Sequence, residues 1–130
     1  MINREIIRIK IVQLAYAYYQ NGNKNIETAE KELFFSLSKA YDLYHHLLAL
    51  IVAVTKESER RLEVFRAKAK REHKPEPSAK FALNRFAIQL ASNKQLNDAV
   101  GTQKHTWADE PEFVGKLLDQ IEQTQFSANF

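Results

Sequence analysis

Apolar residues recur at helical spacing along almost the whole chain. The first helix is expected from about Asn3 to Gln20, before the turn signal Asn21-Gly22-Asn23. Its apolar residues surround most of the helix circumference, which is typical of a buried helix. Only three Gly and three Pro interrupt the 130 residues, and no alternating strand pattern occurs. The pattern predicts an all-α fold, a compact bundle of about five to six helices.

The middle of the chain predicts a long helical region. Asn25 can cap a second helix, and neither Gly nor Pro occurs between Ile26 and His73. A single helix of this length would overhang a small domain, so we expect a break near Ser36 to Ser38. The Pro75-Glu76-Pro77 loop should stop the helical region, because proline removes a backbone donor.

The last third predicts three shorter helices. Ser78 can cap one that ends at about Ala91, and another is expected from Lys94 to Val100. Asp109, with Glu110 and Pro111 behind it, is a good start for the last helix. The expected core face of that helix consists of Phe113, Val114, Leu117, Leu118 and Ile121.

Two features flank this last helix. Trp107, just before the expected start, should anchor it to the rest of the fold. The segment from Gln123 to Phe130 is expected to fray.

Composition favours a single domain covering residues 1–130, long enough to form its own core. The absence of cysteine excludes disulfides and thiolate metal sites, which fits a reducing cytoplasm. No apolar run reaches membrane-spanning length, and the N-terminus lacks a signal-peptide pattern. We therefore expect a cytoplasmic protein without membrane contact.

The charge is unevenly distributed. Residues 56–74 contain eight Lys or Arg against four Glu, a net of +4, although the whole chain carries only +3. Residues 109–130 contain five acidic residues against Lys116, a net of −4. The basic segment fits an electrostatic footprint for RNA, or equally a solvated helix with pairs such as Glu57 with Arg61.

Catalytic chemistry finds no support in the sequence. There is no Gly-rich phosphate loop, no nucleophile motif and no recognisable carboxylate pair. His45, His46 and His73 lack further ligands at metal spacing. We expect neither an enzyme nor a cofactor or metal.

The first helix offers the best candidate chemistry. Arg4 and Arg8 are four residues apart, so they share one helix face, and guanidinium groups match phosphate oxygens. Alternatively, Arg8 pairs with a carboxylate at the core edge and Arg4 is merely solvated. Tyr16, Tyr18 and Tyr19 can stack on unpaired bases, or they belong to the core.

The same helix carries a resemblance. Arg4, Arg8, Val12, Gln13 and Tyr16 follow a pattern that resembles the N-terminal motif of NusB, the bacterial transcription antitermination family. Further segments look like the N-terminal region of a longer NusB subgroup, so that the resemblance covers nearly all 130 residues: Ala29 to Leu37, Tyr41 to His45, Asn84 to Phe86 and Asn93 to Leu96.

The resemblance implies a helical fold that binds boxA-type RNA of ribosomal RNA leaders together with NusE, a ribosomal protein, in an antitermination complex on RNA polymerase. By this carry-over Arg4 and Arg8 contact RNA, with Lys10 and Tyr16 as weaker candidates. Glu5 stands where another arginine is common, and its charge opposes phosphate binding.

Two further departures bear on this implication. Ala15 stands where leucine is usual. The C-terminal signature of the family is missing, which implies an incomplete chain. The alternative function is a helical protein-interaction domain without RNA contact, in which the acidic last helix and the basic long helix dock on a partner or form a homodimer.

Overall fold

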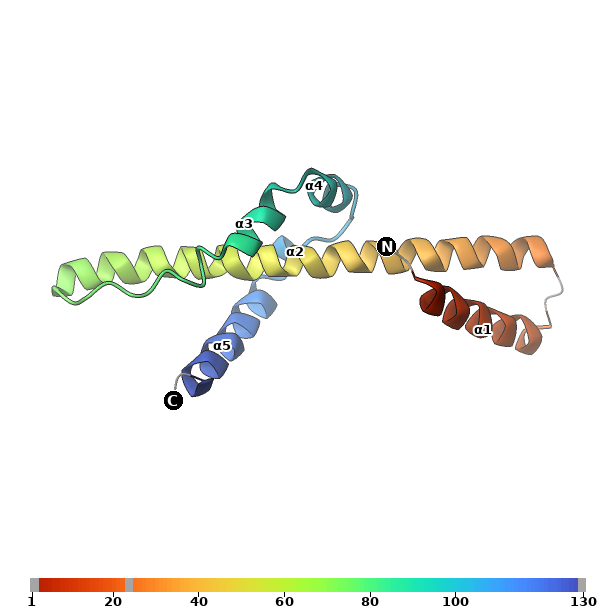
Figure 1. Cartoon of the computed structure of the whole chain (residues 1–130), viewed down its shortest axis with the longest axis horizontal. Coiled ribbons are helices and arrows are strands. Elements are labelled where there is room, and N and C mark those ends of the chain that lie inside the picture. Colours follow the sequence, from red (N-terminus) through yellow and green to blue (C-terminus); the bar gives the residue numbers. More distant parts are fainter. Residues whose placement is uncertain (1–2, 23–24, 129–130) are drawn as a thin grey trace. The chain divides into compact units, whose positions relative to one another are not determined.

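The computed structural model describes residues 3–22 and 25–128, with side chains up to Thr124. This part of the chain is all-α, as predicted, and contains no strand. The described elements are shown in Figure 1: α1 (Arg4–Gln20), α2 (Ile26–Glu72), α3 (Arg85–Ser92), α4 (Lys94–Gly101), the 3-10 helix η1 (Trp107–Asp109) and α5 (Pro111–Ala128).

Both ends of α1 agree with the prediction. The Asn3 side chain caps the helix, because its Oδ1 accepts a hydrogen bond from the Ile6 amide at 2.9 Å. Gly22 follows with φ of 63°, a left-handed conformation that glycine adopts without strain. Asn23, the last residue of the predicted turn signal, lies outside the described residues.

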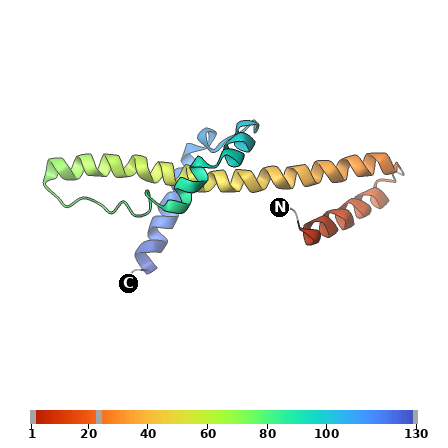
Figure 2. The same ribbon diagram turned by 45° about the horizontal axis from the view of Figure 1, so that its top comes forward.

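The helix α2 runs unbroken for 47 residues and is the long ribbon in Figures 1 and 2. Asn25 caps it as expected, accepting from the Glu27 amide at 3.0 Å. The predicted break near Ser36 to Ser38 is wrong, because serine costs a helix only about half a kcal/mol.

The end of α2 agrees with the sequence. His73 adopts a φ of 52°, and the Lys74 amide donates to the Ala69 carbonyl at 2.9 Å, just before Pro75. This pattern is a Schellman motif, which satisfies a carbonyl at the helix end. The proline-containing segment therefore follows a properly capped terminus.

The predicted cap of the next helix is wrong. Ser78 receives only the Lys80 amide, at 3.5 Å, and opens a single turn. Asn84 is extended at ψ of 124°, which ends that turn, and its Oδ1 accepts from the Phe86 amide at 2.8 Å. Therefore α3 begins at Arg85. The short helix predicted from Lys94 is confirmed as α4, capped by Asn93.

Two predictions near α5 are also corrected. Asp109 does not start α5; its carboxylate accepts from the Thr106 amide at 3.1 Å and thereby closes η1. The helix starts at Pro111, a residue suited to a first helical position. The predicted frayed tail is wrong as far as Ala128, where α5 ends, while residues 129–130 lie outside the described part.

The chain divides into two compact units, the first ending at Tyr44 and the second beginning at His45. The second unit has a core in which Val54 of α2 packs against Val114 and Leu118 of α5. The predicted core face of α5 is thus confirmed at its centre. The prediction of one domain over residues 1–130 stays a prediction.

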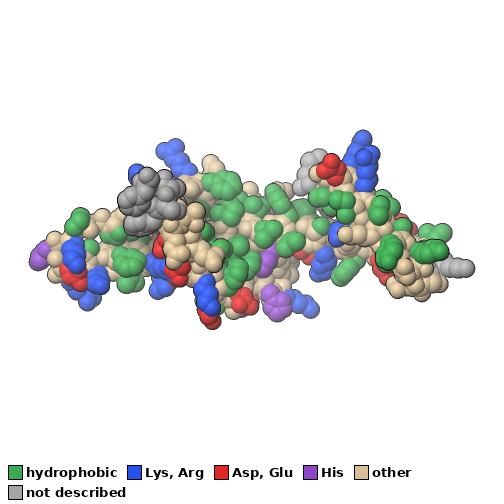
Figure 3. Space-filling model, turned by 90° about the horizontal axis from the view of Figure 1, so that it is seen from below, with side chains coloured by type: hydrophobic (Ala, Val, Ile, Leu, Met, Phe, Trp, Pro, Cys, Tyr) green, Lys and Arg blue, Asp and Glu red, His purple; other side chains and the backbone are tan. Residues whose placement is uncertain are grey.

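The first unit differs in its packing. None of its described residues is buried, so the expectation of a buried α1 is wrong. Large hydrophobic side chains are open to solvent here as elsewhere on the face shown in Figure 3. Over the described helices, none combines the length and apolar character needed to span a membrane.

Candidate nucleic-acid interface

Arg4 and Arg8 lie one turn apart on α1, and both side chains are exposed. Neither forms an ion pair with any residue in the described part of the chain. The alternative in which Arg8 pairs with a carboxylate at the core edge is therefore not observed among the described residues. Both guanidinium groups are available to a ligand.

The two arginines begin a longer exposed face of α1. Steps of three or four residues keep side chains on one helix face. We call this face the basic stripe; its members are Arg4, Arg8, Val12, Tyr16 and Tyr19. Tyr16 is 67% exposed and Tyr19 is 84% exposed. The stripe thus places cations at one end of the helix and open aromatic rings at the other.

The three tyrosines of α1 lie on two different faces of the helix. Tyr18 is half-buried, whereas Tyr16 and Tyr19 are open. The Tyr16 hydroxyl accepts a hydrogen bond from Gln20 Nε2 at 3.2 Å. The resemblance assigns RNA contact to Tyr16 alone, whereas the base-stacking interpretation includes Tyr19, which the three-residue spacing places on the same face as Tyr16.

Lys10 belongs to another side of the helix. Six residues from Arg4 correspond to a rotation of about 240°. Lys10 is half-buried, as are Ile7 and Leu14 on the same side. The structure therefore brings Arg4, Arg8 and Tyr16 together on one face and leaves Lys10 off it.

Glu5 has a local structural role. It lies in the first turn of α1, where a carboxylate interacts favourably with the positive end of the helix dipole. Arg4 in the same turn has the opposite sign and is disfavoured by that dipole. Positive charge at this helix end suits an anionic partner.

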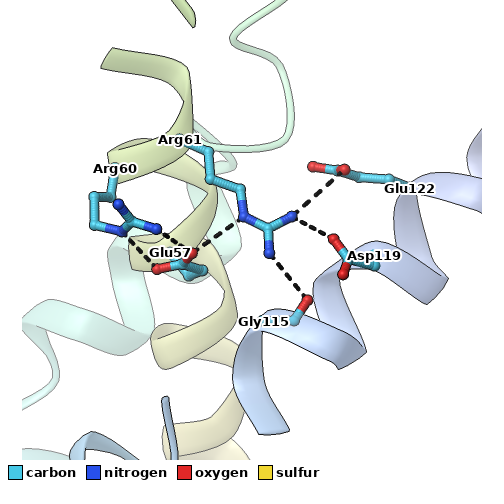
Figure 4. A network of polar contacts seen from close by, with 6 residues as sticks. All are labelled: Glu57, Arg60, Arg61, Gly115, Asp119 and Glu122. Carbon is cyan, nitrogen blue, oxygen red and sulfur yellow. Dashed lines mark hydrogen bonds and ion pairs between the residues drawn. The ribbon is translucent and has the colours of Figure 1, made fainter. Parts of the chain in front are cut away.

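The basic segment of α2 is partly neutralised within the second unit (Figure 4). Glu57 Oε1 accepts from Arg61 Nε at 3.1 Å, so the predicted pair is confirmed, and the same carboxylate binds Arg60. The hydrogen bond from Arg60, with help from Arg61, lowers the pKa of Glu57 to about 2 against its burial. These three charges stabilise the helix surface.

Arg61 also joins α2 to α5. Its guanidinium donates to Asp119 at 2.5 Å and to the Gly115 carbonyl at 3.1 Å, and Glu122 lies 3.8 Å away (Figure 4). A Cβ at Gly115 would lie 3.3 Å from Arg61 Nη2, so the close approach favours glycine. Two of the acidic residues of α5 are therefore paired with Arg61 within the second unit.

Four cations of the segment keep their charge exposed, with no ion pair to a described residue. They are Lys56, Lys68, Lys70 and Arg71. The two interpretations of the basic segment thus apply to different residues: a paired surface around Glu57, and open cations, three of which lie near the end of α2.

His46 and Trp107 pack against each other. Trp107 stacks on His46 with ring centroids 4.3 Å apart, and its Nε1 donates to the His46 carbonyl at 2.7 Å. It also stacks on Phe113 at 5.5 Å, which confirms the anchor role predicted for it. No group of three metal-ligating side chains occurs among residues 3–22 and 25–128.

Comparisons of the chain with protein-family models, with curated proteins and with solved structures find no match. The features of this chain that bear on its function are therefore the surface chemistry of α1 and the motif resemblance.

Proposed function

We propose that the chain is an RNA-binding module of a NusB-like transcription antitermination factor. It acts in the cytoplasm on boxA-type RNA of ribosomal RNA transcripts, with NusE and RNA polymerase as partners. The observation that carries the proposal is the basic stripe of α1, on which Arg4, Arg8 and Tyr16 are exposed together.

Each end of the stripe has a physical role in this function. Arg4 and Arg8 hold phosphate oxygens through charge-assisted hydrogen bonds, which fix the RNA backbone on the helix. Tyr16 and Tyr19 offer ring faces to unpaired bases, since stacking on an open aromatic side chain contributes about 1–3 kcal/mol per base. Lys10 contributes only long-range positive potential from its half-buried side.

A titration with single-stranded boxA-type RNA tests the two arginines. The double variant Arg4→Glu with Arg8→Glu should bind at least about tenfold more weakly, since phosphate contacts dominate affinity. Measurements at two salt concentrations should also show a shallower salt dependence, by about 0.7 in the logarithmic slope for each lost contact.

A matched double variant controls for net charge. Arg85→Glu with Lys104→Glu makes the same charge change at exposed positions of the second unit and should bind RNA nearly as the unmodified chain does. Equal affinity of the α1 variant and the unmodified chain would exclude this role for Arg4 and Arg8. Absence of any RNA binding at low salt, together with a tight dimer, would favour the protein-interaction alternative.

A further inference from the structure

A groove opens on the second unit between α2, α4, η1 and α5. Its volume is about 430 Å³, and small-ligand sites usually measure roughly 300–1,000 Å³. All residues that line the groove belong to the second unit. The groove therefore shares no residue with the basic stripe of α1 and is a separate feature of the surface.

The groove is lined mainly by aliphatic side chains. Ala49 and Ala53 lie one turn apart on α2, and their small side chains leave space between α2 and the facing helices. Leu96 and Val100 of α4 and Val114 of α5 form the other walls, and Leu96 and Val114 are almost completely buried. Displacement of water from such a surface favours an apolar ligand.

Trp107 supplies the one aromatic ring among the described residues of the lining. This indole already stacks on His46 and on Phe113, with ring centroids 4.3 Å and 5.5 Å apart. A flat aromatic ligand would compete with those contacts, whereas a flexible hydrocarbon chain packs against the aliphatic walls without disturbing them. The lining thus favours an aliphatic ligand.

Charged side chains occupy the groove where α2 continues beyond Ala53. Lys56, Glu57 and Arg60 line this end. Both oxygens of the Glu57 carboxylate accept from Arg60, at 2.7 and 2.9 Å, and Arg61 binds the same carboxylate from the other side (Figure 4). Lys56 is exposed and forms no ion pair with a described residue. Two cations against one carboxylate leave the lining with a net charge of +1.

We propose that the groove binds an aliphatic carboxylate, a medium-chain fatty acid whose hydrocarbon chain lies between α2, α4 and α5 and whose head group pairs with Lys56. Lys56 and Arg60 are four residues apart, so they lie on the same side of α2. Because no described carboxylate pairs with the Lys56 ammonium, it is available to the head group, and charge-assisted hydrogen bonds are about twice as strong as neutral ones. The head group is therefore held by charge and the chain by apolar contact.

An NMR titration of the full chain tests the site, with decanoate kept below its micelle concentration. We expect saturable shifts of the methyl signals of Leu96, Val100 and Val114. Decanol has the same chain without the charge and should bind at least about tenfold more weakly. Butanoate has the charge with a much shorter chain and should also bind at least about tenfold more weakly, because each buried methylene contributes to affinity.

Three variants separate the two parts of the site. Lys56→Gln should weaken decanoate binding by at least about fivefold and leave decanol binding unchanged. Lys68→Gln is the matched control, since Lys68 is an equally exposed cation about three turns further along α2 and outside the groove. It should leave both affinities unchanged. Ala49→Leu adds atoms inside the groove and should weaken both ligands.

Circular dichroism monitors the helices of each variant. Lys56 and Lys68 are exposed, so their substitutions keep the test valid if Ala49→Leu folds poorly. Three results would overturn the proposal: methyl shifts that do not saturate, equal affinities for decanoate and decanol, or an equal effect of Lys56→Gln and Lys68→Gln.

The inference goes beyond RNA binding and is separable from it. No residue of α1 lines the groove, so Arg4→Glu with Arg8→Glu retains the whole fatty-acid site. That double variant should bind decanoate as the unmodified chain does. Loss of RNA affinity and loss of decanoate affinity are therefore independent results.

Discussion

Neighbouring residues of α2 have different roles in the second unit. Arg60 is exposed and binds Glu57, whereas Arg61 is mostly covered and reaches α5. Both arginines favour the ionised form of Glu57. The hydrogen bond from Arg60 is the larger cause of the low pKa of Glu57. The stability of this unit should therefore depend on pH through Glu57.

The expected dependence follows from the direction of the shift. The ordinary pKa of 4.5 is lowered to about 2 in the folded chain, so the contribution of Glu57 is fully present above pH 4.5 and is lost as the pH falls to 2. We expect this loss to be about 1 kcal/mol, because water screens the Arg60 side of the pair. Urea unfolding at several pH values measures it.

Glu57→Gln should show a correspondingly smaller decrease in unfolding free energy over that pH range. Glu59→Gln is the control, since Glu59 is exposed and has no ion pair with a described residue. If the curves of Glu57→Gln and the unmodified chain run parallel between pH 4.5 and 2, the assignment fails.

At the scale of elements, the caps decide where helices begin. Asn84, which accepts the Phe86 amide at 2.8 Å, determines the start of α3, whereas Ser78 receives only one long contact. Asn84→Ala should lower the unfolding free energy of the second unit by about 1 kcal/mol. Ser78→Ala should change it by less than about 0.5 kcal/mol. Denaturant titrations that gave the reverse order would refute this assignment.

Helix existence was predictable from apolar spacing, and several ends were predictable from Asn caps. Asn25 and Asn93 behave as the sequence indicates, because an asparagine before an apolar periodic run has one strong role. Ser78 and Asn84 compete for the start of α3, and Asp109 competes with Glu110 for the start of α5, so local sequence alone does not select the first helical residue. The break in α2 was predicted from domain size alone, because the residues near Ser36 to Ser38 include no Gly or Pro that would end a helix.

At the scale of the whole molecule, burial was the hardest property to predict. The apolar character of α1 indicates a buried helix, yet α1 has no buried residue. Burial requires that other parts of the fold pack against the helix, and the sequence of α1 alone does not determine this. The candidate site was partly predictable: a four-residue spacing places Arg4 and Arg8 on one face. The same spacing places Tyr19 on that face and Lys10 on another, but how far each side chain is exposed depends on packing.

The stacking of Trp107 on His46 also makes the two units separately observable. Trp107 is the only tryptophan of the chain, and it lies in the second unit. Its fluorescence should therefore report that unit, while far-ultraviolet ellipticity reports every helix. Because α1 has no buried residue, we expect ellipticity to begin falling at lower urea than the emission changes.

Recording both signals along one urea titration checks this expectation, and coincident curves would contradict it. The stacked indole thus serves as an intrinsic spectroscopic label, so that loosening of α1 and loss of the Val54 core can be told apart without any chemical modification.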